Sequence, residues 1–397
     1  MEMTHETNGE LLLQLSHCLT PTHRINNAAI VLRGGRILAV GGMSAFKQTQ
    51  PSRIFSMTDC YALPGFVDTS IYGTGGCDCM HADRGADIAE MSRILAAHGV
   101  CTFFPTTMSY EREGLQRVVE SLADRCDEQL PGAVAAGIHI EGPFINASKH
   151  GAHRERYIRP IDLGETAELL QAGKGKIRIF TFAPELDGTV ELVEKLCAEN
   201  VIPAMGHTIA NRDQVVRAIE AGASRCSHLY NSMEPLKQRD VGLAALALTD
   251  ARLWVELIPD GIHIHPGMID LACRCIPHEK LVCISNSMAA AGVGDQDVET
   301  AECVEGLFDH GIDSGFVGDV GFDAKRPAAQ GFYFGHHGAG RQFFVVFLSG
   351  FEADVVDHDV GTQASEMQNV GAAQSAGTSG DKGDFVLKFH IVLQVLV

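Results

Sequence analysis

The chain has 397 residues, of which 45% are hydrophobic and 20% charged, and it carries a net charge of −19 at pH 7. This length suits one large domain with a smaller one, and the acidic excess argues against nucleic acid or an anionic membrane as a partner. No apolar run reaches the roughly 18 residues of a membrane span, and the acidic N-terminus does not have the form of a signal peptide. With its 12 scattered cysteines interpreted as reduced thiols, the composition predicts a cytoplasmic globular protein.

The first clear pattern lies at residues 28–40. The segment "AAIVLRGGRILAV" has two β-rich runs around a Gly-Gly turn, which is typical of a β-hairpin. We therefore assign residues 1–62 to the N-terminal part of a small β-domain.

From "LPGFVDTSIYG" onward, short apolar runs alternate with amphipathic segments such as "GLQRVVESLADRC" and "NRDQVVRAIEAG", the latter ending at the helix-capping Gly222. Such alternation fits a closed barrel better than an open sheet. The predicted fold is thus α/β, a TIM-like (β/α)8 barrel over residues 63–300, with a small β-sandwich domain. The expected strands cover residues 65–71, 101–106, 134–141, 176–182, 201–207, 225–229, 253–259 and 281–286.

The composition changes in the last part of the chain, residues 301–397. It is rich in Gly, with clusters such as "GFYFGHHGAGRQFFVVF", and continues through "TQASEMQNVGAAQSAGTSGDKGD" to an apolar tail, "FVLKFHIVLQVLV". The polar stretch predicts flexibility, and the tail is compatible with one strand. We expect a divergent, partly disordered region here.

Three of the expected strands end in residues that can bind a metal. They are Glu141 in "GIHIEGP", His207 in "PAMGHT" and His228 in "CSHLYN". Reactive groups gather at the C-terminal ends of barrel strands, so these side chains are expected to converge. A single His at such a position is more often structural, but two imidazoles and a carboxylate together predict a divalent-metal site with open positions for water. His139 points to the same side as Glu141, as a supporting or core residue.

Several segments resemble a known family. "GIHIEGPFINASKHGAH", "GHTIANRDQ", "SHLYNSM" and "DGIHIHP" resemble, in order, the signature segments of N-acetylglucosamine-6-phosphate deacetylases, in the amidohydrolase superfamily. "LPGFVDTSIYGTGG" is similar to the first barrel strand of that family. The resemblance implies a metal-dependent hydrolase that removes the acetyl group from this phosphorylated amino sugar, and it implies a homodimer. Zinc is the expected ion, and iron, manganese and cobalt accept the same ligands.

The resemblance also implies roles for individual residues. Glu141, His207 and His228 match the metal ligands of the family. The implied substrate-binding residues are His153, Asn231, Ser232, Arg239 and His263.

Two of these residues have a phosphate-binding character. Arg239 suits a phosphate dianion, and His263 supplies a further donor; in this family the two come from the neighbouring subunit of the dimer. Arg239 as a solvated loop charge and Asn231 as a turn-former stay open as alternatives.

The chain departs from the family pattern at chemically important positions. Ser70 and Tyr72 stand where many amidohydrolases carry His-x-His, which implies one metal ion rather than two. Asn286, in "ISNSMAAAG", stands where the family places the Asp that takes a proton from water and delivers it to the leaving amine. An amide cannot do this, so we expect the reaction to be slowed by roughly 10²–10⁴-fold.

The sequence leaves several alternatives open. Asn286 can be an introduced inactivating change, a natural variant, a loss compensated elsewhere, or a simple turn cap. The chain can accordingly be an inactive sugar-phosphate-binding homologue, or a deacetylase of a related substrate such as N-acetylgalactosamine 6-phosphate. The expected lid loop and returning strands of the small domain find no match after residue 300 beyond a weak similarity in "GFEADVVDHD". Divergence and a disrupted reading frame both account for that.

Overall fold

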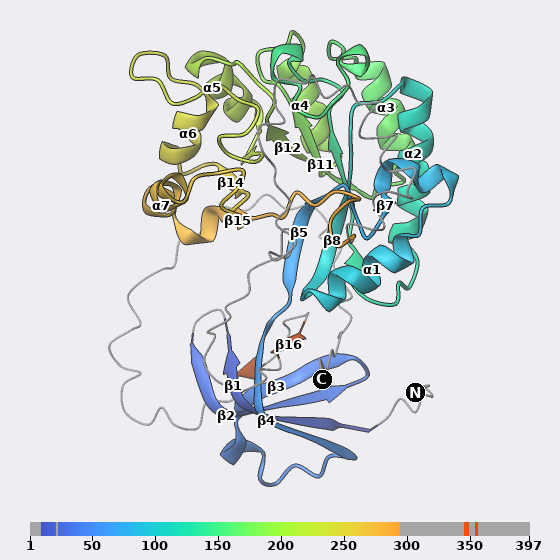
Figure 1. Cartoon of the computed structure of the whole chain (residues 1–397), viewed down its shortest axis with the longest axis vertical. Coiled ribbons are helices and arrows are strands. Elements are labelled where there is room, and N and C mark those ends of the chain that lie inside the picture. Colours follow the sequence, from blue (N-terminus) through green and yellow to red (C-terminus); the bar gives the residue numbers. More distant parts are fainter. Residues whose placement is uncertain (1–8, 21–22, 294–344, 349–353, 356–397) are drawn as a thin grey trace. The chain divides into compact units, whose positions relative to one another are not determined.

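The computed structural model describes residues 9–20, 23–293, 345–348 and 354–355 (Figure 1). These residues fall into two compact units, one holding the chain up to Phe66 with the two late segments, the other beginning at Val67. The predicted flexible stretch, the apolar tail and most of residues 301–397 lie outside the described part. None of the described helices is both long and apolar enough to cross a membrane.

The larger unit is a barrel of parallel strands surrounded by helices, which confirms the predicted fold class (Figure 1). A continuous apolar core fills the space between strands and helices. Along the sheet, the barrel strands are β5 (Phe66–Ile71), β8 (Val100–Thr107), β10 (Ile138–Glu141), β11 (Ile177–Phe182), β12 (Ile202–Met205), β13 (Arg225–Cys226), β14 (Trp254–Leu257) and β15 (Leu281–Cys283).

The helices follow the strands in alternation. In α2, residues Leu115, Val118, Val119 and Leu122 are buried, at the spacing of one helix face. α5 begins at the capping box of Asn211. The described α-helices are α1 (Ile88–Ala97), α2 (Arg112–Cys126), α3 (Leu163–Ala172), α4 (Thr189–Ala198), α5 (Arg212–Ala221), α6 (Leu243–Thr249) and α7 (Pro266–Cys275). Short 3-10 turns occur at Met43–Phe46, Cys79–Arg84, Ala147–Lys149, Glu155–Tyr157 and His278–Lys280.

Except for β8, the barrel strands are shorter than the sequence predicts. β12 and β13 stop at Met205 and Cys226, so His207 and His228 lie two residues beyond them. Both histidines have left-handed backbones, with φ of 47° and 26°, which ends the extended conformation before each side chain. The predicted strand at 134–141 is divided into β9 (Val134–Ala135) and β10.

The first and last barrel strands meet at a seam. Ile71 and Ser287 form a parallel bridge, and the Tyr72 backbone N–H donates to the Ser287 carbonyl at 2.8 Å. The Asp68 carboxylate spans the seam, since it accepts the backbone N–H of Ser70 and of Ser285, each at 3.0 Å. The seam therefore places Asn286 next to β5.

The smaller unit is built on a six-stranded sheet in the order β16-β4-β1-β2-β3-β17. The predicted hairpin is present as β2 and β3, joined at Gly34 and Gly35, whose φ values are 55° and 77°. Buried Leu12 and Leu13 belong to separate apolar clusters, so both faces of the sheet are covered, as in one layer of a sandwich. The strands of the sheet are β1 (Leu11–Leu19), β2 (Arg24–Arg33), β3 (Arg36–Gly42), β4 (Arg53–Pro64), β16 (Val345–Leu348) and β17 (Asp354–Val355). The larger unit also holds a two-stranded ribbon of β6 (Gly73–Thr74) and β7 (Cys77–Asp78).

The weakly matched segment "GFEADVVDHD" supplies β17, which pairs with β3 in parallel, while β16 pairs with β4. At least two strands of the sheet thus return from the far end of the chain.

Candidate functional site

Three side chains meet at the C-terminal end of the barrel. Glu141 is the last residue of β10, and its Oε1 lies 2.6 Å from Nε2 of His207 and 3.1 Å from Nε2 of His228. The two Nε2 atoms are 3.2 Å apart. The side chains are buried, with 1–5% of their surface exposed. The structure therefore brings together the three residues that the sequence singles out as metal ligands.

The hydrogen bonds of the two imidazoles fix which nitrogen faces Glu141. His207 Nδ1 donates to the Lys149 carbonyl at 2.7 Å, and His228 Nδ1 donates to the Asn231 carbonyl at 3.1 Å. A carbonyl only accepts, so each neutral ring presents the lone pair of Nε2 to the carboxylate. Bonds of 2.0–2.1 Å to a tetrahedral metal ion set ligand atoms about 3.3 Å apart, close to two of the three separations here. The donor set fits a divalent metal ion with a further position open.

The electrostatics of this pocket favour positive charge. Burial opposes the charge on Glu141, yet the adjacent imidazoles of His228, His153 and His207 hold the pKa of this carboxyl well below its usual range. Burial likewise opposes the charged form of His228, but the Glu141 carboxylate outweighs it and raises the pKa of His228. A carboxylate that stays ionised in a dry pocket attracts a cation.

His153 reaches the same point but in a different role. Its Nδ1 accepts the backbone N–H of Ser109 at 2.9 Å, so Nε2 carries the hydrogen and points toward Glu141 Oε1 at 3.7 Å. Burial lowers the pKa of His153 to about 4, against the opposing effect of Glu141. His153 is consequently a neutral hydrogen-bond donor at the centre and not a metal ligand.

β5 and the residue that follows it contribute two side chains, Ser70 and Tyr72, whose part in the site the sequence signals only as departures from His-x-His. The Tyr72 hydroxyl donates to Glu141 Oε2, and Ser70 Oγ donates to Asn286 Oδ1 at 2.9 Å. Burial, followed by the charge of Glu141, raises the pKa of Tyr72 well above its ordinary value. Asn286 has a left-handed backbone, with φ of 52°.

Besides His153, two more of the five predicted substrate-binding residues border the centre. Asn231 holds His228 through its carbonyl, and the Ser232 carbonyl accepts the N–H of Thr208 at 3.1 Å. A Cβ on Gly151 would lie 2.8 Å from Ser232 Oγ, so the loop that follows β10 passes close to this side chain.

The other two, Arg239 and His263, lie on exposed loops after β13 and β14. His263 Nδ1 is 2.6 Å from Asp260 Oδ2. For Arg239, no hydrogen bond or ion pair joins it to another described residue. Within one chain the structure does not bring these two side chains into contact with Glu141.

A second buried carboxylate, Glu256 in β14, lies inside the same barrel. It is paired with Arg225 Nη1 at 2.7 Å and accepts hydroxyls from Thr69 at 2.9 Å and Ser227 at 3.2 Å. His139 belongs to this layer, because its nitrogens contact the Thr69 carbonyl and a Thr181 hydroxyl. Both carboxylate oxygens of Glu256 and both ring nitrogens of His139 have partners, so neither side chain is free to bind a metal ion.

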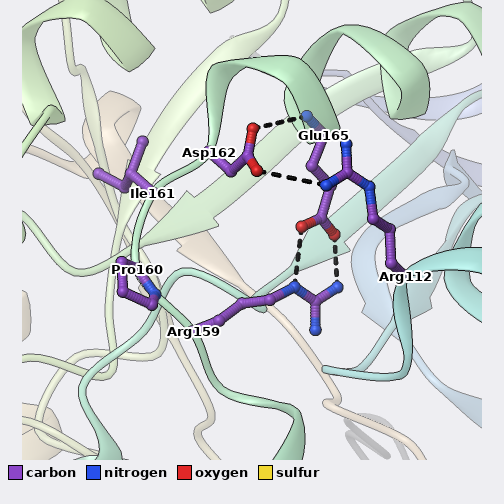
Figure 2. A pocket seen from close by; sticks show the side chains of 6 residues that line it. All are labelled: Arg112, Arg159, Pro160, Ile161, Asp162 and Glu165. Atoms are coloured by element: carbon purple, nitrogen blue, oxygen red, sulfur yellow. Dashed lines mark hydrogen bonds and ion pairs between the residues drawn. The ribbon is translucent and has the colours of Figure 1, made fainter.

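A hollow of about 440 Å³ lies beside the loop that carries His153 (Figure 2). Figure 2 shows the Arg159 guanidinium forked against the Glu165 carboxylate, and Arg112 reaching Asp162. Arg112 also binds Glu168 at 2.8 Å. The two cations are matched by three acids, so the hollow has no spare positive charge for a phosphate. Instead, Arg159 Nη1 donates to the Tyr110 carbonyl at 2.8 Å and fixes the end of the loop.

Known proteins resemble the chain in sequence. No family model matches it. An N-acetylglucosamine-6-phosphate deacetylase from Bacillus subtilis is 36% identical over 288 residues, 72% of each chain. An N-acetylgalactosamine-6-phosphate deacetylase from Escherichia coli O157:H7 is 34% identical over 233 residues, which is 58% of this chain and 61% of that protein, less than two thirds of its length.

Solved structures agree with this relationship. The deacetylase of Mycobacterium smegmatis, crystallised as an Asp-to-Ala mutant with N-acetylglucosamine 6-phosphate, superposes with a TM-score of 0.66 at 34% identity, over 72% of this chain and 73% of that one. The Thermotoga maritima enzyme gives a TM-score of 0.61 at 28% identity, over 71% and 72%. The chain belongs to the N-acetylglucosamine-6-phosphate deacetylase family of the amidohydrolase superfamily, whose members are hydrolases acting on amides.

Proposed function

We propose that the chain hydrolyses the acetamide of N-acetylglucosamine 6-phosphate to glucosamine 6-phosphate and acetate. The reaction would take place where Glu141, His207 and His228 hold one divalent ion, zinc by preference, with iron, manganese and cobalt as alternatives. The observation that carries the proposal is the convergence of one carboxylate oxygen and two imidazole nitrogens within 4.8 Å in a buried pocket. Relatives that bear this activity in their names support the substrate.

The residues around the ion account for most of the chemistry. When bound, the ion lowers the pKa of water and polarises a carbonyl. Glu141 and the two imidazoles fix the position of the ion, and the Nε2–H of His153 is aimed to stabilise the oxygen that becomes negative as water adds to the acetyl carbon. The C–N bond then breaks, and the amine leaves with a proton.

The proton transfer is the weak step in this chain. Asn286 neither accepts a proton from the attacking water nor delivers one to the amine. We therefore propose a slow deacetylase whose binding site is intact. Calorimetry with the sugar phosphate, beside an acetate-release assay, separates a slow enzyme from a homologue that only binds.

The phosphate would be bound by Arg239 and His263 of a second copy, next to Asn231 and Ser232 of the first. Support comes from the position of Arg239 and His263 on exposed loops, away from Glu141. Light scattering on the purified full chain tests the homodimer, and a monomer that keeps full substrate affinity would contradict it.

A deacetylase of N-acetylgalactosamine 6-phosphate is the second candidate, because relatives with that name match at 34% and 30% identity. The test compares acetate release from both sugar phosphates by zinc-loaded protein, with His207→Ala as the control. Faster turnover of the glucosamine derivative supports the proposal. Failure of both the chain and its Asn286→Asp variant to release acetate from either substrate would overturn it.

A further inference from the structure

The two oxygens of the Glu141 carboxylate have different neighbours. Oε1 faces Nε2 of His207 and His228, at 2.6 and 3.1 Å. Oε2 accepts the hydroxyl of Tyr72, from the far side of the carboxylate. Only Oε1 is thus directed at the point where the imidazole lone pairs converge.

A glutamate side chain does not maintain such an orientation unaided. The terminal torsion of Glu is broad, so the carboxylate turns freely unless a partner holds it. A phenol with an ordinary pKa near 10 is protonated at neutral pH, so Tyr72 acts there as a donor to Oε2. The same bond supplies the partner that a buried Oε2 needs.

Tyr72 is itself held firmly at the barrel seam. Its backbone N–H donates to the Ser287 carbonyl, and its own carbonyl accepts the N–H of Cys79, both at 2.8 Å. Its side chain lies on the same side of the chain as that of Ser70, two residues earlier, which reaches Asn286. The end of β5 and the residue after it therefore contact both the Glu141 carboxylate, through Tyr72, and the position of the missing acid, through Ser70.

From this geometry we propose that Tyr72 is a positioning residue, which fixes the Glu141 carboxylate so that Oε1 alone is offered to the metal ion. The inference rests on the proposed metal site. Outer-sphere partners of ligands typically contribute 10–100-fold in metal affinity.

The test is Tyr72→Phe in the full chain, which keeps the ring and removes the hydroxyl. Zinc affinity, measured by competition with a chelating dye, should fall by about 10–100-fold. The visible spectrum of the cobalt-loaded protein should shift, because the carboxylate is free to bind through either oxygen or both. Tyr157→Phe, which removes a hydroxyl bound to Arg156, is the matched control and should change neither quantity.

A double-mutant cycle distinguishes positioning from a general effect on folding. In a Glu141→Ala background, Tyr72→Phe should alter zinc affinity by less than about twofold, since the group it orients is gone. An equal loss in both backgrounds would overturn the inference, as would unchanged affinity and an unchanged cobalt spectrum in the single variant. Weak metal binding by the unaltered chain would instead count against the proposed function.

Discussion

Two glutamates are buried on the described strands of this barrel, and they differ in the group that faces the carboxylate. Glu256 faces the permanent charge of Arg225, whereas Glu141 faces the lone pairs of His207 and His228. The charge of Glu256 is balanced by Arg225 within the protein. The charge of Glu141 and the two lone pairs beside it need an added cation. Burial of a carboxylate alone therefore does not mark a site; the kind of group opposite decides between an internal ion pair and a binding centre.

The largest effect is expected from Glu141→Gln. This change keeps the shape of the side chain and removes the charge that binds the ion. Zinc affinity should fall by at least about a thousandfold, beyond the 10–100-fold of outer-sphere changes, with acetate release falling to background. Calorimetric titration with zinc measures it. Affinity within tenfold of the unaltered chain would show that the charge of Glu141 is not needed.

Glu256→Gln should have the opposite effect to Glu141→Gln: it should lower the stability of the fold and leave zinc affinity nearly unchanged. It leaves the buried Arg225 without a counter-charge, and breaking a buried pair in this way costs about 3 kcal/mol or more of the free energy of unfolding. Urea unfolding measures that loss, and zinc affinity of the folded variant should stay within about threefold. A loss of zinc affinity in Glu256→Gln as large as that in Glu141→Gln would contradict the assignment of metal binding to Glu141 and of an internal ion pair to Glu256.

On β5, the buried carboxylate of Asp68 has backbone donors, and among the described residues no cation is paired with it. Burial, helped by the charge of Glu256, raises the pKa of Asp68 to about 6, against the hydrogen bonds from Ser285 and Ser70. The folded chain thus binds this proton more tightly than the unfolded chain, so the contribution of Asp68 to stability is greatest below pH 4 and is lost as the pH rises through 6.

The contribution of Asp68 to the free energy of unfolding should fall by about 2–3 kcal/mol between pH 4 and pH 7. It should be absent in Asp68→Asn, and subtracting the urea unfolding curves of this variant from those of the unaltered chain isolates it. Parallel pH dependences of the two proteins would contradict the assignment.

The smallest predicted effect is a gain. Asn286→Asp restores an acid/base group beside the metal site and should raise kcat at least tenfold, about 1.4 kcal/mol in activation free energy. Asn286→Ala is the control and should show no gain. An unchanged rate in folded, zinc-loaded Asn286→Asp would exclude the proton-transfer role of this position.

Much of this architecture could be predicted from the sequence. The alternation of apolar runs with amphipathic segments gave the eight barrel strands, and strand ends located Glu141, His207 and His228. The ends of β12 and β13 could not be predicted, because the left-handed residues just beyond them, His207 and His228, are not of the types that usually indicate a turn.

Contacts across the barrel were harder to foresee. Arg225 and Glu256 are 31 residues apart on neighbouring strands, and nothing in the sequence around either charge indicates that they pair. In the sequence, Tyr72 stands out only as a missing histidine, since nothing local indicates that its hydroxyl meets Glu141. Pairing of β16 and β17 with the N-terminal sheet depends on contacts across some 300 residues, to which local patterns are blind.

The seam between β5 and β15 has a consequence for how this protein could change over time. Asn286 accepts the Ser70 hydroxyl through Oδ1, an atom that aspartate possesses as well. Exchanging one terminal nitrogen for an oxygen therefore leaves the joint between the ends of the barrel undisturbed. In descendants of such a chain, a single codon change at position 286 is therefore enough to remove or restore catalytic turnover without a change in the fold.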